Sequence, residues 1–485
     1  MQNKRESRNP NNSYLTNEMS EDRLHIVMIP WLAFGHMIPY LELAKLIAQK
    51  GHKISFLSTT RNINRLPKIP PTLALNLELI KLPLPHIDGL PDDAESTLDI
   101  PPQMVQYLMK AYDNIQEPVT RFLETSDPDW VLHDFASYWA SSIAAKVGCK
   151  SAYMSIFIPP VLGFLGPVAG LVDSTQSERS KPEDFTLRSK WVNFSTSVAF
   201  KLHEIRKIFA CVGGDVSGVS VMNRHGMSLR DCDVLAIRGC AEFDAEWLDV
   251  LRELHRKPVI PVGQLPTSEN DDLDADNEDW LAMKAWLDKQ ERTVVYLAFG
   301  SEAIPSQQEL NEIALGLEKS ELPFFWVLKK RCGLTDPEPL ELPNGFDERI
   351  SDRGFICMGW APQVKILAHD SIGGFLTHAG WSSVVESLQF KRPLILLTFS
   401  NDQGLTRSYL EDKKLGYPIP RDGSDGSFTR ESVAGSLRLV VAEEEGKIYR
   451  DNAKEISWVF GDRKRQDHCV DSLLHQLHSF RNGVH

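Results

Sequence analysis

Short apolar runs alternate with longer amphipathic segments along most of this 485-residue chain. In the first unit, an apolar run at 24–29 precedes a helical pattern at 41–48, and Pro39 is expected in the first turn of that helix. Buried strands that alternate with helices are typical of a parallel sheet with helices on both faces. The alternation therefore predicts an α/β fold. The strand candidates are 24–29, 52–59, 77–79, 130–133, 151–154, 234–237, 259–262, 294–299, 324–328, 355–358, 374–377 and 394–397.

An acidic, polar stretch divides this pattern into two halves. It reads GQLPTSENDDLDADNED and contains almost no large apolar side chains, which is typical of a solvated linker. A metal site is the alternative, but nothing in the stretch fixes its carboxylates around an ion. We predict two Rossmann-like, doubly wound domains. The predicted boundaries are a disordered tail at 1–22, an N-terminal domain at 23–262, the linker at 263–279, a C-terminal domain at 280–460 and a helix at 461–485 that packs on either domain.

Composition excludes several classes of protein. The net charge of −13 argues against binding to nucleic acid or to anionic membrane surfaces. The seven cysteines are scattered and never stand in C-x-x-C spacing, so reduced thiols and a cytoplasmic location are expected. The first 22 residues lack the apolar core of a signal peptide.

One uncharged run, at 153–172, is long enough to cross a bilayer by its length alone. Three prolines and three glycines would break such a helix repeatedly, so no membrane span is expected. The run instead predicts a buried strand that continues into an apolar loop. Such a loop is suited to line a pocket for an apolar ligand.

A histidine and an aspartate follow two of the predicted strands. His36 stands in PWLAFGHMIP, just after the first strand, and Asp134 directly follows the strand at 130–133. Ligands of open parallel sheets bind at the carboxyl ends of the strands, so both residues are expected at one ligand-binding edge. A histidine held by a carboxylate can take a proton from a hydroxyl nucleophile. The alternatives are a turn histidine without chemistry and an aspartate that only caps a helix.

Several common catalytic motifs are absent from the sequence. It contains no G-x-S-x-G, so the histidine and aspartate are not part of a recognisable hydrolytic triad. The turn after the first strand lacks G-x-G-x-x-G, and no Walker lysine motif is present. Neither a dinucleotide site nor an NTP-binding loop is therefore predicted.

A turn in the second half is suited to bind a diphosphate. The segment GGFLTHAGWSSVVESLQF has the pattern of a strand, a turn and a helix, so the N–H groups from Gly380 to Ser383 begin a helix without acceptors of their own. Helix N-termini bind anions, and His378, Ser382 and Ser383 add further donors. The alternative is a turn that only caps the helix.

Two side chains near this turn are suited to bind a nucleoside. Glu386 lies about one turn into the predicted helix, where its carboxylate can accept hydrogen bonds from two ribose hydroxyls. Trp360, in GWAPQ, stands beside a proline-fixed turn and is suited to stack on a flat base. The simpler interpretations are a solvated helix glutamate and a buried core tryptophan.

Together these segments resemble the signature box of plant UDP-sugar-dependent glycosyltransferases, the family 1 inverting enzymes of the GT-B fold. The box runs from Trp360 to Gln403, WAPQVKILAHDSIGGFLTHAGWSSVVESLQFKRPLILLTFSNDQ, with its W-A-P-Q start, H-x-G-W core, glutamate and D-Q end in register. The G-H-x-x-P element at His36 and the FGS turn at 299–301 extend the resemblance to nearly the whole chain after residue 22. It implies two Rossmann-like domains that face each other across a cleft.

The resemblance also implies a role for each matching position. His36 would be the general base and Asp134 the residue that orients it. A terminal glutamine is found with glucose as the donor sugar in most of the family. The implied donor-binding residues are Trp360 on the uracil, with Ala361 beside it; Gln363 and Glu386 on the ribose; Ser301, His378, Ser383 and the backbone near Gly380 and Trp381 on the diphosphate; and Asp402 and Gln403 on the sugar hydroxyls.

Four positions depart from the family pattern. Ala379 replaces a frequent cysteine and is expected to be harmless, whereas Ser382 replaces the common asparagine and is expected to shorten a contact to phosphate or sugar. Lys391 stands where glycine is usual and Thr398 where proline is usual. These two changes affect the backbone that orients Asp402 and Gln403. The sequence therefore determines that the donor is a UDP-sugar better than it determines which sugar is transferred.

The opening segment, Ser382 and the GSEA turn at 300–303 are similar to the branch that adds sugars to sugars already attached to flavonoids or terpenoids. We therefore predict a monomeric inverting transferase that moves glucose from UDP-glucose to such a glycoside, without a metal or other cofactor. The alternatives are transfer to the hydroxyl of a small aglycone, a non-catalytic UDP-sugar-binding protein and an epimerase that acts on the UDP-sugar itself.

Overall fold

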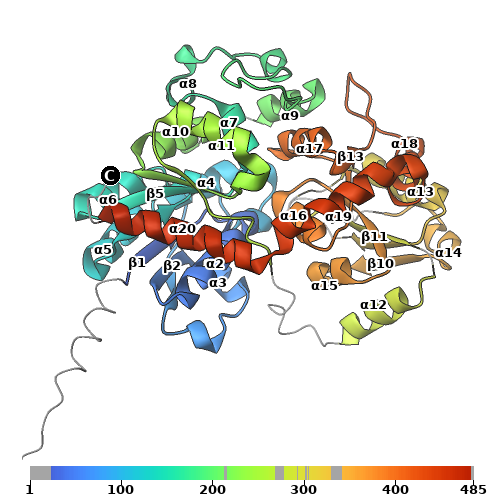
Figure 1. Ribbon diagram of the computed structural model, residues 1–485, viewed down its shortest axis with the longest axis horizontal. Helices are drawn as coiled ribbons and strands as arrows, with labels where there is room; N and C mark the ends of the chain where they lie inside the picture. The colour runs from blue at the N-terminus through green and yellow to red at the C-terminus, as the bar shows by residue number, and fades with distance from the viewer. Residues whose placement is uncertain are drawn as a thin grey trace, which may run out of the picture.

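The structure is a computed structural model that describes residues 23–211, 216–267, 278–291, 293–300, 303, 305–328 and 341–481. Each half of the chain forms one sheet with helices packed on it, and the two halves lie side by side (Figure 1). Four parts of the sequence predictions lie outside the described residues: the tail at 1–22, residues 268–277 of the linker, Ser301 with residue 302 of the GSEA turn, and residues 482–485 of the C-terminal helix.

The first half folds into a seven-stranded sheet with the order β3-β2-β1-β4-β5-β6-β7. All neighbouring pairs are parallel, so the carboxyl ends of the strands share one edge. The strand order reverses between β1 and β4, and such a switch point is where open α/β sheets bind ligands. The strands are β1 (His25–Ile29), β2 (Lys53–Thr59), β3 (Leu77–Leu82), β4 (Trp130–His133), β5 (Lys150–Ser155), β6 (Val234–Ile237) and β7 (Val259–Pro261).

The second half folds into a six-stranded parallel sheet with the order β10-β9-β8-β11-β12-β13. Its last strand was not predicted, because the short G-Y-P sequence of β13 contains the residues that strands usually avoid. The strands are β8 (Val294–Ala298), β9 (Phe324–Leu328), β10 (Gly354–Met358), β11 (Ile372–Thr377), β12 (Leu394–Leu396) and β13 (Gly416–Pro418).

Helices pack on both faces of each sheet, as the alternating side chains of the strands require. In β1, Val27 and Ile29 point into one core cluster, whereas Ile26 and Met28 point into another. The helices of the first half are α2 (Phe34–Gln49), α3 (Thr60–Arg65), α4 (Val105–Asp113), α5 (Gln116–Ser126), α6 (Ala140–Val147), α7 (Pro159–Leu165), α8 (Val168–Val172), α9 (Leu202–Cys211), α10 (Val221–Asp231) and α11 (Ala241–His255). Those of the second half are α12 (Glu278–Asp288), α13 (Gln307–Ser320), α14 (Phe346–Arg349), α15 (Gln363–Ala368), α16 (Trp381–Gln389), α17 (Gln403–Asp412), α18 (Arg430–Val441), α19 (Lys447–Gly461) and α20 (Arg463–Arg481).

Helix α2 begins earlier than the sequence predicted. The extended residue Ala33 precedes the helix, whose first residue is Phe34, so Pro39 lies in the helix interior rather than in its first turn. Proline there removes only the hydrogen bond to the carbonyl of Gly35. His36 therefore stands in the first helical turn, where its N–H donates to Ala33 O at 2.9 Å.

The apolar run at 153–172 does not form the predicted loop. After β5 it continues into the short helices α7 and α8, and Pro159 and Pro160 occupy the first turn of α7, where a missing N–H costs little. No helix in the described part of the chain is long and apolar enough to cross a membrane.

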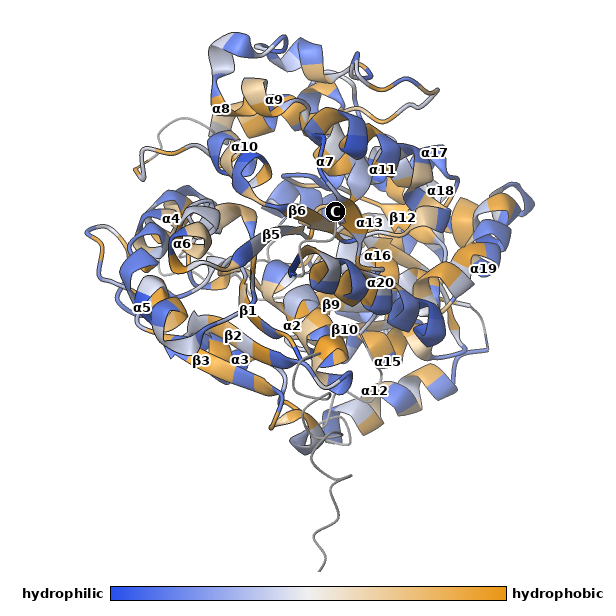
Figure 2. Ribbon diagram, turned by 60° about the vertical axis from the view of Figure 1, so that its left-hand side comes forward, coloured by the Kyte–Doolittle hydropathy of each residue, from blue (hydrophilic) through white to orange (hydrophobic). Residues whose placement is uncertain are grey.

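The last helix, α20, runs back across the first half of the chain (Figure 1). Its apolar residues Val470, Leu473 and Leu477 are buried in the core cluster that contains α2. Leu477 O also accepts a hydrogen bond of 3.2 Å from Trp130 Nε1. Figure 2 shows mainly hydrophilic residues on the outer side of this helix.

The backbone of Lys391 explains why glycine is usual at this position. Lys391 follows α16 with a φ of 65°, in the left-handed region that favours glycine. We expect Lys391→Gly to raise the free energy of unfolding by about 1 kcal/mol, since a side chain in this region costs about that much. Denaturant unfolding would measure the change. The matched Lys110→Gly within α4 should lower stability by about 1 kcal/mol, and a destabilised Lys391→Gly would contradict the prediction.

Candidate functional site

His36 and Asp134 meet at the carboxyl edge of the first sheet. Nδ1 of His36 lies 2.7 Å from Oδ2 of Asp134, and their side chains are 12% and 0% exposed. The parallel pairing of β1 with β4 places them together, although they lie far apart in the sequence. The carboxylate assigns the proton of the neutral imidazole to Nδ1 and makes Nε2 its acceptor nitrogen.

Backbone groups hold the Asp134 carboxylate in place. Oδ2 also accepts from Trp31 N at 3.1 Å, and Oδ1 accepts from Phe135 N at 2.7 Å. The second bond caps the 3-10 turn Phe135–Ser137. Asp134 is therefore both the cap and the histidine's partner, two interpretations that the sequence had presented as alternatives.

Aromatic side chains surround the imidazole of His36. Its ring centroid lies 5.6 Å from the rings of both Phe135 and Phe157. His225 of α10 stacks on Phe135 at 4.6 Å, and its Nδ1 lies 2.9 Å from the hydroxyl of Tyr153. Burial lowers the pKa of His225 to about 3, so it is neutral at physiological pH. Sequence reasoning missed His225 because no local motif marks it.

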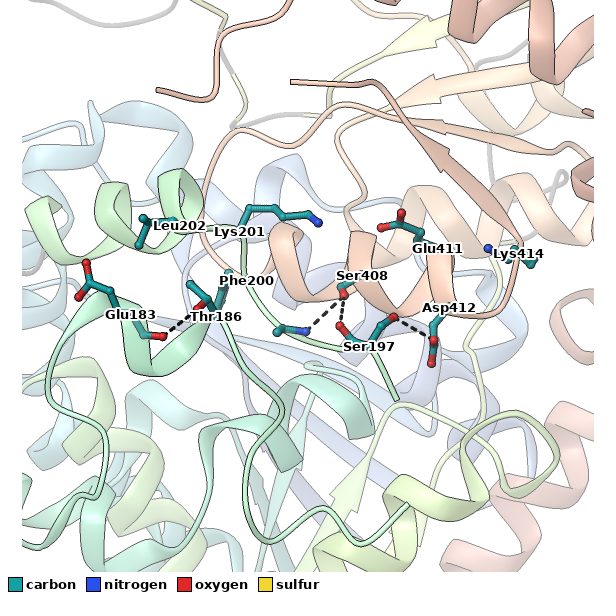
Figure 3. A pocket seen from close by; sticks show the side chains of 11 residues that line it. Glu183, Thr186, Ser197, Phe200, Lys201, Leu202, Ser408, Glu411, Asp412 and Lys414 are labelled. Atoms are coloured by element: carbon teal, nitrogen blue, oxygen red, sulfur yellow. Dashed lines mark hydrogen bonds between the residues drawn. The ribbon is translucent and has the colours of Figure 1, made fainter. Parts of the chain in front are cut away.

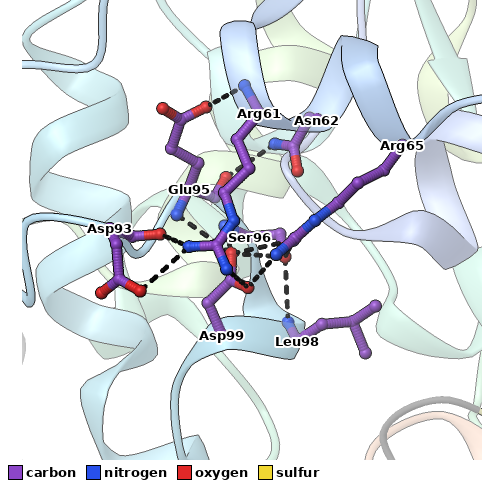
Figure 4. A network of polar contacts seen from close by, with 8 residues as sticks. All are labelled: Arg61, Asn62, Arg65, Asp93, Glu95, Ser96, Leu98 and Asp99. Carbon is purple, nitrogen blue, oxygen red and sulfur yellow. Dashed lines mark hydrogen bonds and ion pairs between the residues drawn. The ribbon is translucent and has the colours of Figure 1, made fainter.

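A polar network joins α3 to the loop after β3, which lies beside the turn that leads to His36; Figure 4 shows the network. Arg65 of α3 donates to both carboxylate oxygens of Asp99, at 3.1 and 2.7 Å, and Arg61 points toward the same carboxylate. In the same loop, Thr97 N donates to Leu32 O at 3.0 Å. The loop after β3 is thereby tied both to α3 and to the turn between β1 and α2.

The N-terminus of α16 lies at the corresponding edge of the second sheet, after β11. Gly380 is its N-cap, and the first main-chain bond runs from Val384 N to Gly380 O, which leaves the preceding N–H groups without acceptors in the helix. His378 packs directly on this backbone: a Cβ atom on Gly380 would lie 2.3 Å from its Nε2. A Cβ on Gly300 would lie 2.6 Å from its Cε1. Both glycines are therefore needed for the imidazole to reach the helix N-terminus.

Two of the residues predicted to bind a nucleoside, Gln363 and Glu386, are in contact. Gln363 Nε2 donates to Glu386 Oε2 at 2.6 Å and to Ser383 Oγ at 3.1 Å. Burial raises the pKa of Glu386, whose Oε1 accepts from Thr267 Oγ1 at 3.2 Å. Trp360 is 60% exposed, which suits stacking on a ligand and excludes its interpretation as a core residue.

Three residues of the box, of which Ala361 and Trp381 were predicted site residues, do not present their side chains at this surface. Trp381 is buried, and its Nε1 donates to Gln264 Oε1 at 2.9 Å, so only its backbone belongs to the turn. Ala361 is half-buried against a core cluster that contains residues of both halves. Ala379 is fully buried, with a φ of 68°.

The first half of the chain supplies a hydrogen-bond donor to the turn at 380–383, which was predicted to bind a diphosphate. Arg238, which follows β6, donates from Nη1 to Ser382 Oγ at 2.9 Å and from Nε to Gln264 O at 2.9 Å. Burial lowers the pKa of Arg238 to about 10, so its guanidinium stays charged at physiological pH. The departure at Ser382 therefore coincides with a contact between the two halves, which no local pattern could predict.

Asp402 and Gln403 begin α17, after β12. The side chain of Gln403 is turned toward the preceding loop, where its Oε1 accepts from Phe399 N at 2.8 Å and from Ser400 N at 3.1 Å. These bonds fix the orientation of the amide and make its NH2 group the donor end. Asp402 is half-buried at the N-cap position of the helix.

Two Rossmann-like parallel sheets, each with a cluster of polar side chains at its carboxyl edge, define the class of the molecule. This is the two-domain GT-B architecture, and the fold class predicted from the sequence is confirmed. The fold is similar to that in a crystal structure of Glycyrrhiza uralensis UGT73P12 complexed with glycyrrhetinic acid 3-O-monoglucuronide. The two structures superpose with a TM-score of 0.77 at 19% sequence identity, over 95% of this chain and 97% of that chain.

Sequence relatives identify the family. The profile described as UDP-glucoronosyl and UDP-glucosyl transferase matches residues 252–469. UDP-glycosyltransferase 91A1 of Arabidopsis thaliana is 52% identical over 96% of this chain and 99% of its own length. Soyasaponin III rhamnosyltransferase of Glycine max is 39% identical over 97% of this chain and 98% of its own length. The chain belongs to the plant UDP-glycosyltransferase family and is a glycosyltransferase enzyme.

Proposed function

We propose that the enzyme transfers glucose from UDP-glucose to a sugar hydroxyl of a terpenoid or flavonoid glycoside, with inversion at the anomeric carbon. The 2.7 Å contact between His36 and Asp134, beside aromatic side chains, carries the proposal. A relative named for a soyasaponin and a similar structure with a bound glucuronide support a glycosylated acceptor.

In the proposed mechanism, the acceptor hydroxyl gives its proton to Nε2 of His36. The acceptor oxygen forms a bond to the anomeric carbon while the bond from that carbon to the diphosphate oxygen breaks, which converts the α-linked donor into a β-linked product. Asp134 stabilises the imidazolium. UDP leaves with the additional negative charge, which the N–H groups and dipole at the start of α16 stabilise.

The donor nucleotide would lie along the polar cluster of the second half. Trp360 would stack on the uracil, and Gln363 and Glu386 would bind the ribose. The hydrogen bond between these last two side chains already sets the distance between them. His378 and the backbone at Gly380 would contact the diphosphate, which leaves the sugar near the start of α17.

Gln403→His is expected to lower the preference for UDP-glucose over UDP-galactose by about tenfold, or about 1.4 kcal/mol. An imidazole cannot accept the two backbone N–H groups that Gln403 Oε1 accepts and still present an NH2 group to the sugar. The ratio of kcat/KM for the two donors measures the change. The exposed Gln308→His on α13 is the control, and an unchanged ratio for Gln403→His would remove its role in reading the sugar.

A mass-spectrometric screen tests the donor and the acceptor together. UDP-glucose, UDP-galactose and UDP-rhamnose would each be offered with terpenoid and flavonoid aglycones and with the corresponding monoglucosides. We expect a second hexose on the monoglucosides with UDP-glucose. Products formed only from aglycones would favour the alternative acceptor, and products formed only from UDP-rhamnose would overturn the proposed donor.

A further inference from the structure

Glu204 is a buried carboxylate of the first half that pairs with a helix of the second half. It lies in α9, and its oxygens Oε1 and Oε2 each lie 3.2 Å from a nitrogen of Arg407 in α17, Nε and Nη2 respectively. The Glu204 and Arg407 side chains are 9% and 6% exposed. This is a bidentate ion pair between the two halves, largely shielded from water.

Two further groups complete the surroundings of this carboxylate. Thr398 Oγ1 donates to Oε1 of Glu204 at 2.9 Å, and Lys201 N donates to Oε2 at 2.8 Å. Each oxygen therefore accepts two hydrogen bonds, which is the full capacity of a carboxylate. Burial acts to raise the pKa of Glu204, but the Arg407 charge and these hydrogen bonds hold it below its usual value. The group is ionised and has little freedom to move.

The same carboxylate lies against the start of α17. A Cβ atom on Gly404 would lie 2.7 Å from Oε2 of Glu204, so only glycine allows this approach. Gly404 directly follows Gln403, and Thr398 precedes the loop whose backbone Gln403 Oε1 contacts. Glu204 therefore touches the chain on both sides of the segment that ends in Asp402 and Gln403.

We propose that Glu204 is a positioning residue for donor-sugar recognition: by holding Thr398, Arg407 and the backbone at Gly404, it sets where Asp402 and Gln403 meet the sugar. The proposal rests on the proposed role of the D-Q pair. It accounts for threonine at 398, because a hydroxyl bonded to the first half replaces the local stiffness of a proline. The sugar is then read by a loop that is held correctly only when both halves are in contact.

Calorimetric titration of the full-length enzyme with UDP, UDP-glucose and UDP-galactose tests the proposal without an acceptor. Glu204→Gln should leave the affinity for UDP nearly unchanged, because the four hydrogen bonds to the Glu204 carboxylate come from Arg407, Thr398 and Lys201 and not from the residues proposed to bind the nucleotide. The Kd for UDP-glucose should rise about tenfold, since small displacements of positioning groups have effects of this size or larger. The preference for UDP-glucose over UDP-galactose should decrease with it.

A matched control lies at the other end of α17. Asp412 accepts from Thr196 Oγ1 at 3.0 Å and from Ser197 Oγ at 2.9 Å, beside a cavity of about 480 Å³ (Figure 3). It joins the same two halves, but it lies about 14 Å along the helix from Gln403. Asp412→Asn should therefore leave the affinities for all three ligands unchanged.

Thr398→Val removes one contact of the carboxylate and keeps the ion pair, so it tests the proposal even if Glu204→Gln fails to fold. It should shift the sugar preference in the same direction by a smaller factor. If both variants weaken UDP and both UDP-sugars equally, or change nothing, Glu204 only joins the domains and the proposal fails. If Gln403→His alone leaves the sugar preference unchanged, the role of Gln403 fails, and Glu204 is still judged by its own change in UDP-glucose affinity relative to UDP.

Discussion

His36→Ala is expected to lower the transfer rate by about 10²- to 10⁴-fold, the usual contribution of a general base. The reason is geometric: the Asp134 carboxylate holds Nδ1 of His36 at 2.7 Å and thereby presents Nε2 as the proton acceptor. The affinity for UDP should stay nearly unchanged, because the polar cluster that we propose to bind the nucleotide belongs to the second half. Single-turnover transfer kinetics and calorimetry with UDP measure the two quantities separately.

The chain contains a matched control for this variant. His369 Nε2 lies 2.9 Å from Asp288 Oδ1, and the His369 side chain is 15% exposed, close to the exposure of His36. This second pair precedes β11, so it lies at the amino ends of the strands rather than at a carboxyl edge such as the one that holds His36. His369→Ala should therefore transfer at nearly the wild-type rate. If His36→Ala transferred sugar at the wild-type rate, another group would have to accept the proton.

Asp134→Asn is expected to lower the transfer rate by a similar factor, about 10²- to 10⁴-fold. His36 and Asp134 act as a unit, so the loss of either one removes most of the contribution of the pair. The amide cannot stabilise an imidazolium as a carboxylate does. It also cannot accept from Trp31 N, Phe135 N and the His36 ring with the same strength. Thermal unfolding should show a lower Tm as well, because these buried donors lose a charged acceptor.

The double variant His36→Ala with Asp134→Asn separates the two effects. If Asp134 acts through His36, the double variant should transfer no more slowly than His36→Ala alone. If the double variant instead lost the product of the two single-variant factors in rate, Asp134 would have a role independent of His36. Asp288→Asn, which changes the corresponding carboxylate of the His369 pair, should leave transfer unchanged and provides the control for the substitution itself.

Much of the fold followed from local sequence patterns. The strands β4, β6 and β9 have the predicted bounds because each is a short apolar run with polar residues or turns at its ends. The misses have local causes too. The strand β13 has an atypical composition, and the start of α2 was misplaced because proline is more common in a first turn than in the interior where Pro39 lies.

Some residues of the candidate site could be predicted from local sequence patterns and others could not. His36 and Asp134 were paired from sequence because parallel strands bring their carboxyl ends to one edge, and the structure places the two side chains in contact. Arg238 and Glu204 carried no such signal. An arginine after one strand and a glutamate on an exposed-looking helix are common, and their importance depends on Ser382 and Thr398 in the other half.

By itself, the sequence determined the α/β class, the position of the signature box and the family, because periodicity and motif spacing are properties of short segments. Only the tertiary structure decided how the two halves meet. It placed Arg238 on Ser382 and Glu204 between Thr398 and Arg407, and it laid α20 on the first half. Buried hydrogen bonds and ion pairs between distant residues depend on the relative position of whole domains, which no local pattern in the chain encodes.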